Sequence, residues 1–151
     1  HIAIQNDNAE ALDLLIEKDY PKNKLDDKGL PPVHYLVHKG ERILKYSKNL
    51  DKLDFNQKDE RGVAVLHKIV YKSGDRLMIK RILETGDTDP NIEGPFNWTP
   101  LHFAVRENNY DLAQLLIKHG AYKSLQDKWN QTPLNIAKDY KYNRIKKYLL
   151  H

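Results

Sequence analysis

The histidines are the residues in this sequence whose type and spacing could do chemistry. His102 lies in the tetrapeptide Thr-Pro-Leu-His, where an imidazole could act as a general base or as a ligand. His34 and His38 are four positions apart, a spacing that puts two imidazoles on one face of a helix. Glu41 could add a third ligand to a zinc site there. The position after His34 holds Tyr35, whereas a zinc metalloprotease motif requires glutamate.

The rest of the sequence offers little for catalysis. The 151 residues include no cysteine, which excludes disulfides, thiolate catalysis and cysteine-based zinc sites. The glycines are isolated turn residues, so no phosphate-binding loop is present. The acidic residues show no recurrent pairing, and no nucleophile, base and orienting residue can be assembled. We therefore expect a protein that is not an enzyme and that binds no cofactor and no metal.

Composition and charge fit one soluble domain. Hydrophobic residues make up 40% and charged residues 30%, and the net charge is +4. No apolar run approaches the roughly 18 residues that span a bilayer, and no basic-then-apolar signal segment opens the chain. The one dense basic segment is KDYKYNRIKK at 138–147. A solvated surface explains it better than a phosphate-binding stripe, so we expect no membrane and no nucleic acid as partners.

A recurring tetrapeptide decides the role of His102. Related copies of TPLH (99–102) are TPLN at 132–135, AVLH at 64–67 and PPVH at 31–34. Their fourth positions lie 33, 35 and 33 residues apart and hold His34, His67, His102 and Asn135. Another 33 residues back from His34 lies His1, which predicts that the chain begins within a repeat. Because such periods are typical of repeat architectures, His102 is a recurring structural residue and not a unique reactive group.

A turn precedes each tetrapeptide with the same period. One of its positions needs a residue that tolerates positive φ, and suitable residues stand there: Gly29, Gly62, Asn97 and Asn130. The aspartate that begins the turn can accept hydrogen bonds from its own turn backbone, and it recurs as Asp26, Asp59 and Asp127. In the third turn Gly94 takes its place, in a repeat with two extra residues, so we expect that loop to be distorted.

Two helices are predicted after each turn. The first begins at the proline position of the tetrapeptide, since proline suits the first turn of a helix. The second carries apolar residues at helical spacing, as in Leu112, Leu115, Leu116 and Ile117. In the second repeat Ser47 and Lys48 stand where a leucine pair is expected. We expect the second helix of that repeat, around 41–50, to be shifted.

The segment TPLHFAVRENNYDLAQLLIKHGA at 99–121 closely resembles the ankyrin repeat family, and the resemblance covers essentially the whole chain. It implies an all-α fold, an ankyrin-repeat solenoid of stacked helix-turn-helix units joined by β-hairpin-like loops. Neighbouring units bury each other's apolar faces. We expect about 4.5 repeats in one domain over 1–151, divided at 1–26 (partial), 27–59, 60–94, 95–127 and 128–151 (terminal cap).

The resemblance also implies roles for the motif residues. In the family the threonine and histidine of the motif bond groups at the start of the first helix and in neighbouring loops. His34, His67 and His102 would then be scaffold residues. Partner proteins usually bind the concave face, which is made of the hairpin tips and the outward residues of the first helices. The resemblance therefore implies a protein–protein interaction module.

Aromatic and arginine side chains at variable positions indicate where a partner would bind. These residue types most often carry interface energy. Our hypothesis is a surface across repeats three to five made of Tyr71, Lys72, Phe96, Trp98, Arg106, Glu107, Lys128, Trp129 and Tyr140. Trp129 stands at a turn apex, so we expect it to be exposed. For Phe96 and Trp98 an alternative stays open, in which they pack onto the distorted loop.

The two ends of the array differ in polarity. The last repeat has Asn135 in the histidine position and Lys138 where other repeats have an apolar residue, as a water-facing cap requires. At the other end Ile2, Ile4 and the apolar run 14–16 need a neighbour. We therefore expect this chain to be a fragment of a longer protein.

Three functions stay open at this point. The first is a monomeric module that binds a protein partner. The second is a targeting or substrate-recruiting arm of a larger multidomain protein, such as a secreted bacterial effector with its enzymatic domain outside this chain. The third and weaker one is nucleic-acid binding through the basic C-terminal segment. The lysine-, asparagine- and tyrosine-rich composition without cysteine suggests, by analogy with host–pathogen effectors, a reducing cytoplasmic location that includes the host cytosol.

Overall fold

The computed structural model describes residues 1–39, 41–72, 75–85 and 87–151, with the side chains at 38–39, 41–42 and 44 left out. Within these ranges five helix pairs follow one another along the chain. They are α1 (Ile2–Gln5) with α2 (Ala9–Glu17), α3 (Leu36–Lys39) with α4 (Glu41–Tyr46), α5 (Val65–Lys72) with α6 (Arg76–Leu83), α7 (Pro100–Arg106) with α8 (Tyr110–Lys118), and α9 (Pro133–Asp139) with α10 (Asn143–Leu150). Short 3-10 turns are η1 (Pro32–Tyr35), η2 (Leu50–Lys52) and η3 (Pro95–Asn97).

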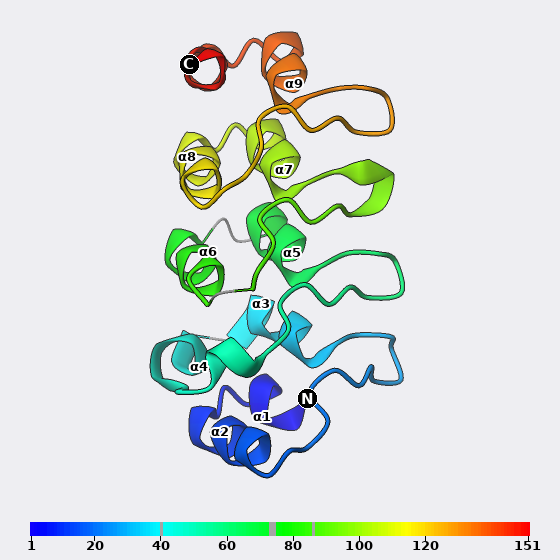
Figure 1. Ribbon diagram of the computed structural model, residues 1–151, viewed down its shortest axis with the longest axis vertical. Coiled ribbons are helices and arrows are strands. Elements are labelled where there is room, and N and C mark those ends of the chain that lie inside the picture. The colour runs from blue at the N-terminus through cyan, green and yellow to red at the C-terminus, as the bar shows by residue number, and fades with distance from the viewer. Residues whose placement is uncertain (40, 73–74, 86) are drawn as a thin grey trace.

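The helix pairs stack into one elongated column of two layers (Figure 1). The odd-numbered helices form the first layer and the even-numbered helices form the second, and helices contact their successors within each layer, as α5 contacts α7 and α6 contacts α8. Four hairpin loops project beside the first layer (Figure 1). In the part of the chain that is described, the β-type pairing is one isolated bridge between Lys58 and Ala64. The predicted all-α solenoid is therefore confirmed.

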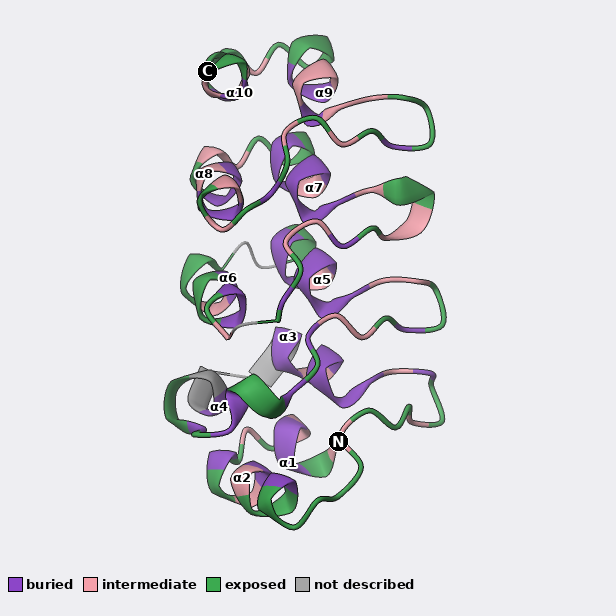
Figure 2. Ribbon diagram, in the orientation of Figure 1, coloured by how far each residue is buried: buried purple, intermediate pink, exposed green. Residues whose placement is uncertain are grey.

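The core lies between the two layers and runs the length of the column (Figure 2). Leu66 and Ile69 of α5 and Leu112 and Leu116 of α8 each expose at most 1% of their surface. Burying one such side chain stabilises the fold by about 1.5–3 kcal/mol relative to leaving it in water. Because each pair buries its apolar faces against the next, the hairpins are held by a continuous scaffold.

The hairpin turns have the predicted conformation. Gly29, Gly62, Asn97 and Asn130 all have positive φ, from 60° to 75°. The predicted aspartate bonds are also confirmed. Asp59 Oδ1 accepts from the N–H groups of Arg61 and Val63, each at 3.0 Å. Asp26 and Asp127 accept the equivalent pairs of bonds in the first and fourth hairpins.

The third hairpin is distorted, as expected. η3 forms there, and Phe96 as well as Asn97 has a left-handed backbone, with φ of 61° at Phe96. Such a conformation costs a bulky residue on the order of 1–3 kcal/mol. A Cβ atom at Gly94 would lie 3.1 Å from Nε2 of His67. A side chain at this position would therefore require a small shift of the His67 imidazole.

The second repeat is irregular over 41–50, where a shifted second helix was expected, but the helix is shortened instead of shifted. α4 ends at Tyr46, and the next residues bond Asp13 of α2 instead of continuing the helix. The carboxylate of Asp13 accepts from the Ser47 hydroxyl and from the N–H groups of Lys48 and Asn49. Leu50 in the following η2 turn is buried in place of the missing leucine pair.

Candidate partner-binding surface

The motif histidine His102 is confirmed as a scaffold residue. The N–H of Thr99 donates to Nδ1 of His102 at 3.1 Å, and Nε2 of the same ring bonds the carbonyl of Gln131 in the next hairpin at 3.2 Å. Because Nδ1 accepts, the proton is on Nε2 and both nitrogens are used. Asn135 makes the first of these bonds only, accepting from the N–H of Thr132 at 2.9 Å.

The pKa values of the buried histidines keep their rings neutral. Burial lowers the pKa of His67 to about 4, and its Nε2 bonds the carbonyl of Ile92 at 2.9 Å. Burial, together with the positive charge of Lys68, lowers the pKa of His34 to about 4. Burial also lowers the pKa of His102. Neutral imidazoles with both nitrogens bonded are structural groups and not acid–base catalysts.

The alternative of a zinc site at His34 receives no support from the described residues. The side chains of His38 and Glu41 lie outside them. Nε2 of His34 bonds the carbonyl of Gln57 at 3.2 Å, and Nδ1 accepts from Nζ of Lys68 at 2.8 Å. Among the residues that the structure describes, no group of three or more histidine, cysteine or acidic side chains could hold a metal ion.

Three residues of the hypothesised surface form a cluster at the hairpin tips, which we call the tip cluster: Phe96, Lys128 and Trp129. The two rings lie 5.4 Å apart, and each of the two residues is 55% exposed. Nζ of Lys128 lies 4.5 Å from the centre of the Phe96 ring and 4.8 Å from the centre of the Trp129 ring. The N–H of Lys128 donates to the carbonyl of Phe96 at 3.0 Å, which ties the third hairpin to the fourth. Ring pairing and cation–π attraction thus order an exposed aromatic surface.

A second cluster lies at the ends of the first-layer helices α7 and α9. The guanidinium of Arg106 lies 4.4 Å over the ring of Tyr140, which stacks on Tyr142 at 5.6 Å. The Tyr142 hydroxyl donates to the carbonyl of Arg106 at 3.4 Å. Arg106, the neighbouring Glu107 and Tyr140 are all exposed.

The remaining first-layer residues lie on α5. Tyr71 and Lys72 are exposed, and the Tyr71 ring meets the half-buried ring of Phe103 edge-on at 6.1 Å. Phe103 also packs edge-on against Trp98 at 4.9 Å. Exposed aromatic and basic groups therefore occur on three successive first-layer helices and on two hairpins.

Trp98 differs from the other hypothesised residues because it packs inward. Its indole N–H donates to Oδ2 of Asp127 at 3.1 Å, and the side chain is half-buried against Phe103 and His102. Trp98 therefore packs inward, as in the alternative, but against α7 and the fourth hairpin and not onto its own distorted loop, while Phe96 is exposed. Trp98 positions the tip cluster and does not itself form an exposed surface.

A second hydrogen bond to the carboxylate of each hairpin aspartate was not predicted from the sequence. Oδ1 holds the turn backbone, while Oδ2 takes a side-chain donor: Tyr35 for Asp26, Lys68 for Asp59, and Trp98 for Asp127. Tyr35 and Lys68 directly follow a motif histidine, and that pattern was available as a signal. Ile136 stands at this position in the last repeat and cannot donate, so the donor there comes from the preceding hairpin.

The helix pairs are stacked, their hairpins project to one side, and the buried polar groups bond within the scaffold. These features define a repeat protein of the solenoid class. A family model described as ankyrin repeats, in three copies, matches residues 66–151. The chain belongs to the ankyrin repeat family.

Relatives of the chain include proteins of different kinds. An ankyrin repeat protein of Acanthamoeba polyphaga mimivirus is 26% identical over 99% of this chain and 19% of its own length. Neurogenic locus notch homolog protein 1 of Homo sapiens is 28% identical over 91% of this chain and 5% of its own length. The 2-5A-dependent ribonuclease of Mus musculus is 39% identical over 48% of this chain and 10% of its own length. The chain thus spans 5% to 19% of these relatives. A membrane-crossing helix is absent from the described residues.

Proposed function

We propose that this chain is a protein–protein interaction module whose partner binds across the third to fifth repeats. The residues that would contact the partner are Tyr71, Lys72, Phe96, Arg106, Glu107, Lys128, Trp129 and Tyr140. Trp98 would act by positioning. Ankyrin repeats are protein–protein interaction modules in general, so the specific part of the proposal is the surface.

The tip cluster is the observation that carries this proposal. Two large rings remain 55% exposed, and both are ordered by Lys128. A partner that covers these rings gains apolar burial without first having to order them. Aromatic residues in such positions are those whose truncation most often costs 2 kcal/mol or more of binding free energy, by the general behaviour of interfaces.

The test is the affinity of the double variant Trp129→Ala with Arg106→Ala for a partner isolated with the wild-type chain. We expect affinity to fall by at least about thirtyfold, which corresponds to about 2 kcal/mol. The matched control is Tyr122→Ala with Lys118→Ala, which removes an exposed aromatic residue and an exposed cation away from the surface. Equal affinities of the two variants, both folded by circular dichroism, would reject the proposed surface.

A second proposal concerns the protein to which this module belongs. Because the chain spans at most 19% of the compared relatives, and one of them is named as a ribonuclease, we also propose that it recruits a target for a larger protein. This proposal predicts that the complete coding sequence contains a further domain. A coding sequence that holds ankyrin repeats alone would exclude it.

Nucleic-acid binding by the basic segment 138–147 is not part of the proposal. The segment runs from α9 in the first layer to α10 in the second, so its charges are divided between layers. The Arg144 guanidinium lies 3.8 Å over the ring of Tyr110. This cation–π contact makes the arginine side chain part of the scaffold.

A further inference from the structure

A groove between the second and third repeats lies outside the tip cluster. Its volume is about 600 Å³, within the range of ligand-binding sites. The tips of the first two hairpins, the η1–α3 segment and α5 form its walls. Apolar contacts are offered by Leu30, Val37 and Val63, and positive charge by Lys28, Arg61 and Lys72.

A bonded polar group of three residues, His34, Asp59 and Lys68, lines this groove. Nζ of Lys68 donates to Oδ2 of Asp59 and to Nδ1 of His34, each at 2.8 Å. An ammonium has three N–H groups, so these two bonds leave one. The Lys68 side chain is 24% exposed, and Lys68 lines the groove. One cationic donor is therefore available to a group that enters the groove.

The groove carries an excess of positive charge. Four cationic side chains line it, against the carboxylates of Asp59 and Glu60. Asp59 is already paired with Lys68. Glu60 lies across Gly29, where a Cβ atom would collide with its side chain. His34 adds no charge near neutral pH, because its pKa is about 4. An anionic group entering the groove would meet an attractive field.

The available donors favour a carboxylate over a phosphate. Phosphates are commonly held by several backbone N–H groups together. In the two hairpins here those groups are already used, since Asp26 accepts from Lys28 and Leu30 and Asp59 accepts from Arg61 and Val63. The donors that face the groove from the described residues are therefore mainly side chains. A single carboxylate matches these donors in charge and in the number of hydrogen bonds that it can accept. Apolar groups on either side of it would contact the walls of the groove.

We propose that this groove receives an aspartate or glutamate side chain, flanked by apolar residues, from an extended segment of the partner protein. The inference rests on the proposed function, since it assigns a chemistry to part of the partner. Lys72 belongs both to the groove and to the proposed surface, and its neighbour Tyr71 continues that surface. A segment leaving the groove past Lys72 would therefore reach the third to fifth repeats.

The experiment titrates the isotope-labelled chain with the blocked peptide Ala-Leu-Glu-Leu-Ala and with its Ala-Leu-Gln-Leu-Ala counterpart, and follows backbone amide shifts by NMR. We expect the glutamate peptide to bind at least about tenfold more tightly, with shifts at Lys28, Arg61 and Lys68. The variant Arg61→Gln with Lys72→Gln should abolish this preference. Lys52→Gln removes an exposed charge outside the groove and should leave it intact. Lys68→Met is avoided as the main variant because it would leave Asp59 buried without its partner.

Every other outcome counts against the inference. Equal affinity of the two peptides, or no binding, would overturn it. Inorganic phosphate binding more tightly than the glutamate peptide would overturn the carboxylate assignment, and N-acetylglutamate binding as tightly would overturn the peptide occupant. The Trp129→Ala, Arg106→Ala variant should keep its peptide affinity. If the glutamate peptide fails while that variant still loses the partner, only the groove assignment falls.

Discussion

At the scale of single residues, two tryptophans in similar hairpin positions have opposite roles. The indole N–H of Trp98 is bonded to Asp127, and its ring packs on Phe103. The ring of Trp129 is exposed, and only its backbone N–H bonds Asp127. The apex position of Trp129 predicts its exposure from the sequence. The packing of Trp98 could not be predicted, because it depends on Ile136, a distant residue that cannot supply the bond to Asp127.

Replacing Trp98 with phenylalanine tests this assignment. The ring contacts are largely kept, but Asp127, which is 5% exposed, loses a donor to its carboxylate. We expect Trp98→Phe to lower the free energy of unfolding by about 1–3 kcal/mol in urea denaturation. The control Trp129→Phe should change it by no more than about 0.5 kcal/mol, as at exposed sites in general. Equal effects of the two variants would contradict the assignment.

At the scale of elements, the sequence predicts most of the scaffold because its repeat period is locally encoded. Positive φ at Gly29 and Asn130 and the bonds of the hairpin aspartates follow from the short motifs themselves. A shifted second helix was predicted in the second repeat, but α4 instead ends early, because Asp13 in another helix bonds the residues that follow it. The pairing of Phe96 with Trp129 was likewise unpredicted, since it requires a contact between hairpins.

The histidines that link hairpins to helices predict how stability changes with pH. His34 and His67 have pKa values of about 4 in the folded chain, against 6.5 for an unperturbed histidine. The unfolded chain therefore binds more protons between these values, so the stabilisation is complete above pH 6.5 and is lost as pH falls toward 4. We expect each histidine to account for about 2 kcal/mol of the loss between neutral pH and about pH 5.

Urea denaturation at a series of pH values measures how the free energy of unfolding changes with pH. His67→Asn copies the residue that Asn135 provides in the last repeat, and it keeps an acceptor for the N–H of Ala64 while removing the titration. The substitution should remove roughly half of the pH dependence of the free energy of unfolding that His34 and His67 contribute together, whatever its effect on stability at neutral pH. A slope that is unchanged in His67→Asn would show that His67 does not carry the effect.

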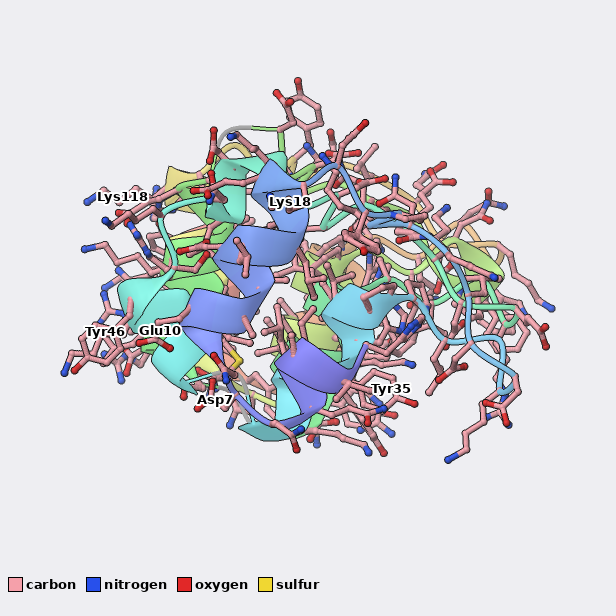
Figure 3. All side chains as sticks on the ribbon, turned by 90° about the horizontal axis from the view of Figure 1, so that it is seen from below. Asp7, Glu10, Lys18, Tyr35, Tyr46 and Lys118 are labelled. Carbon is pink, nitrogen blue, oxygen red and sulfur yellow. The ribbon has the colours of Figure 1, made fainter. Side chains whose placement is uncertain are left out.

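At the scale of the whole molecule, the column has two sides, one made of the hairpins and the first-layer helices and the other of the second-layer helices (Figures 1 and 2). The first side includes the tip cluster and the contact of Arg106 with Tyr140. Viewed along the column, Tyr46 and Lys118 lie on the side of the second-layer helices, away from Tyr35 (Figure 3). Since the core fills the space between the layers, a partner can meet one side without disturbing the other.

Amide hydrogen exchange of the chain, free and bound to its partner, measures which side of the column the partner covers. We expect slower exchange on binding in the hairpin segments 95–98 and 127–131 and at the ends of α5, α7 and α9. The second-layer helices α6 and α8 should exchange as they do in the free chain. Protection confined to the second layer, with both hairpin segments unchanged, would show that the partner does not bind the proposed surface.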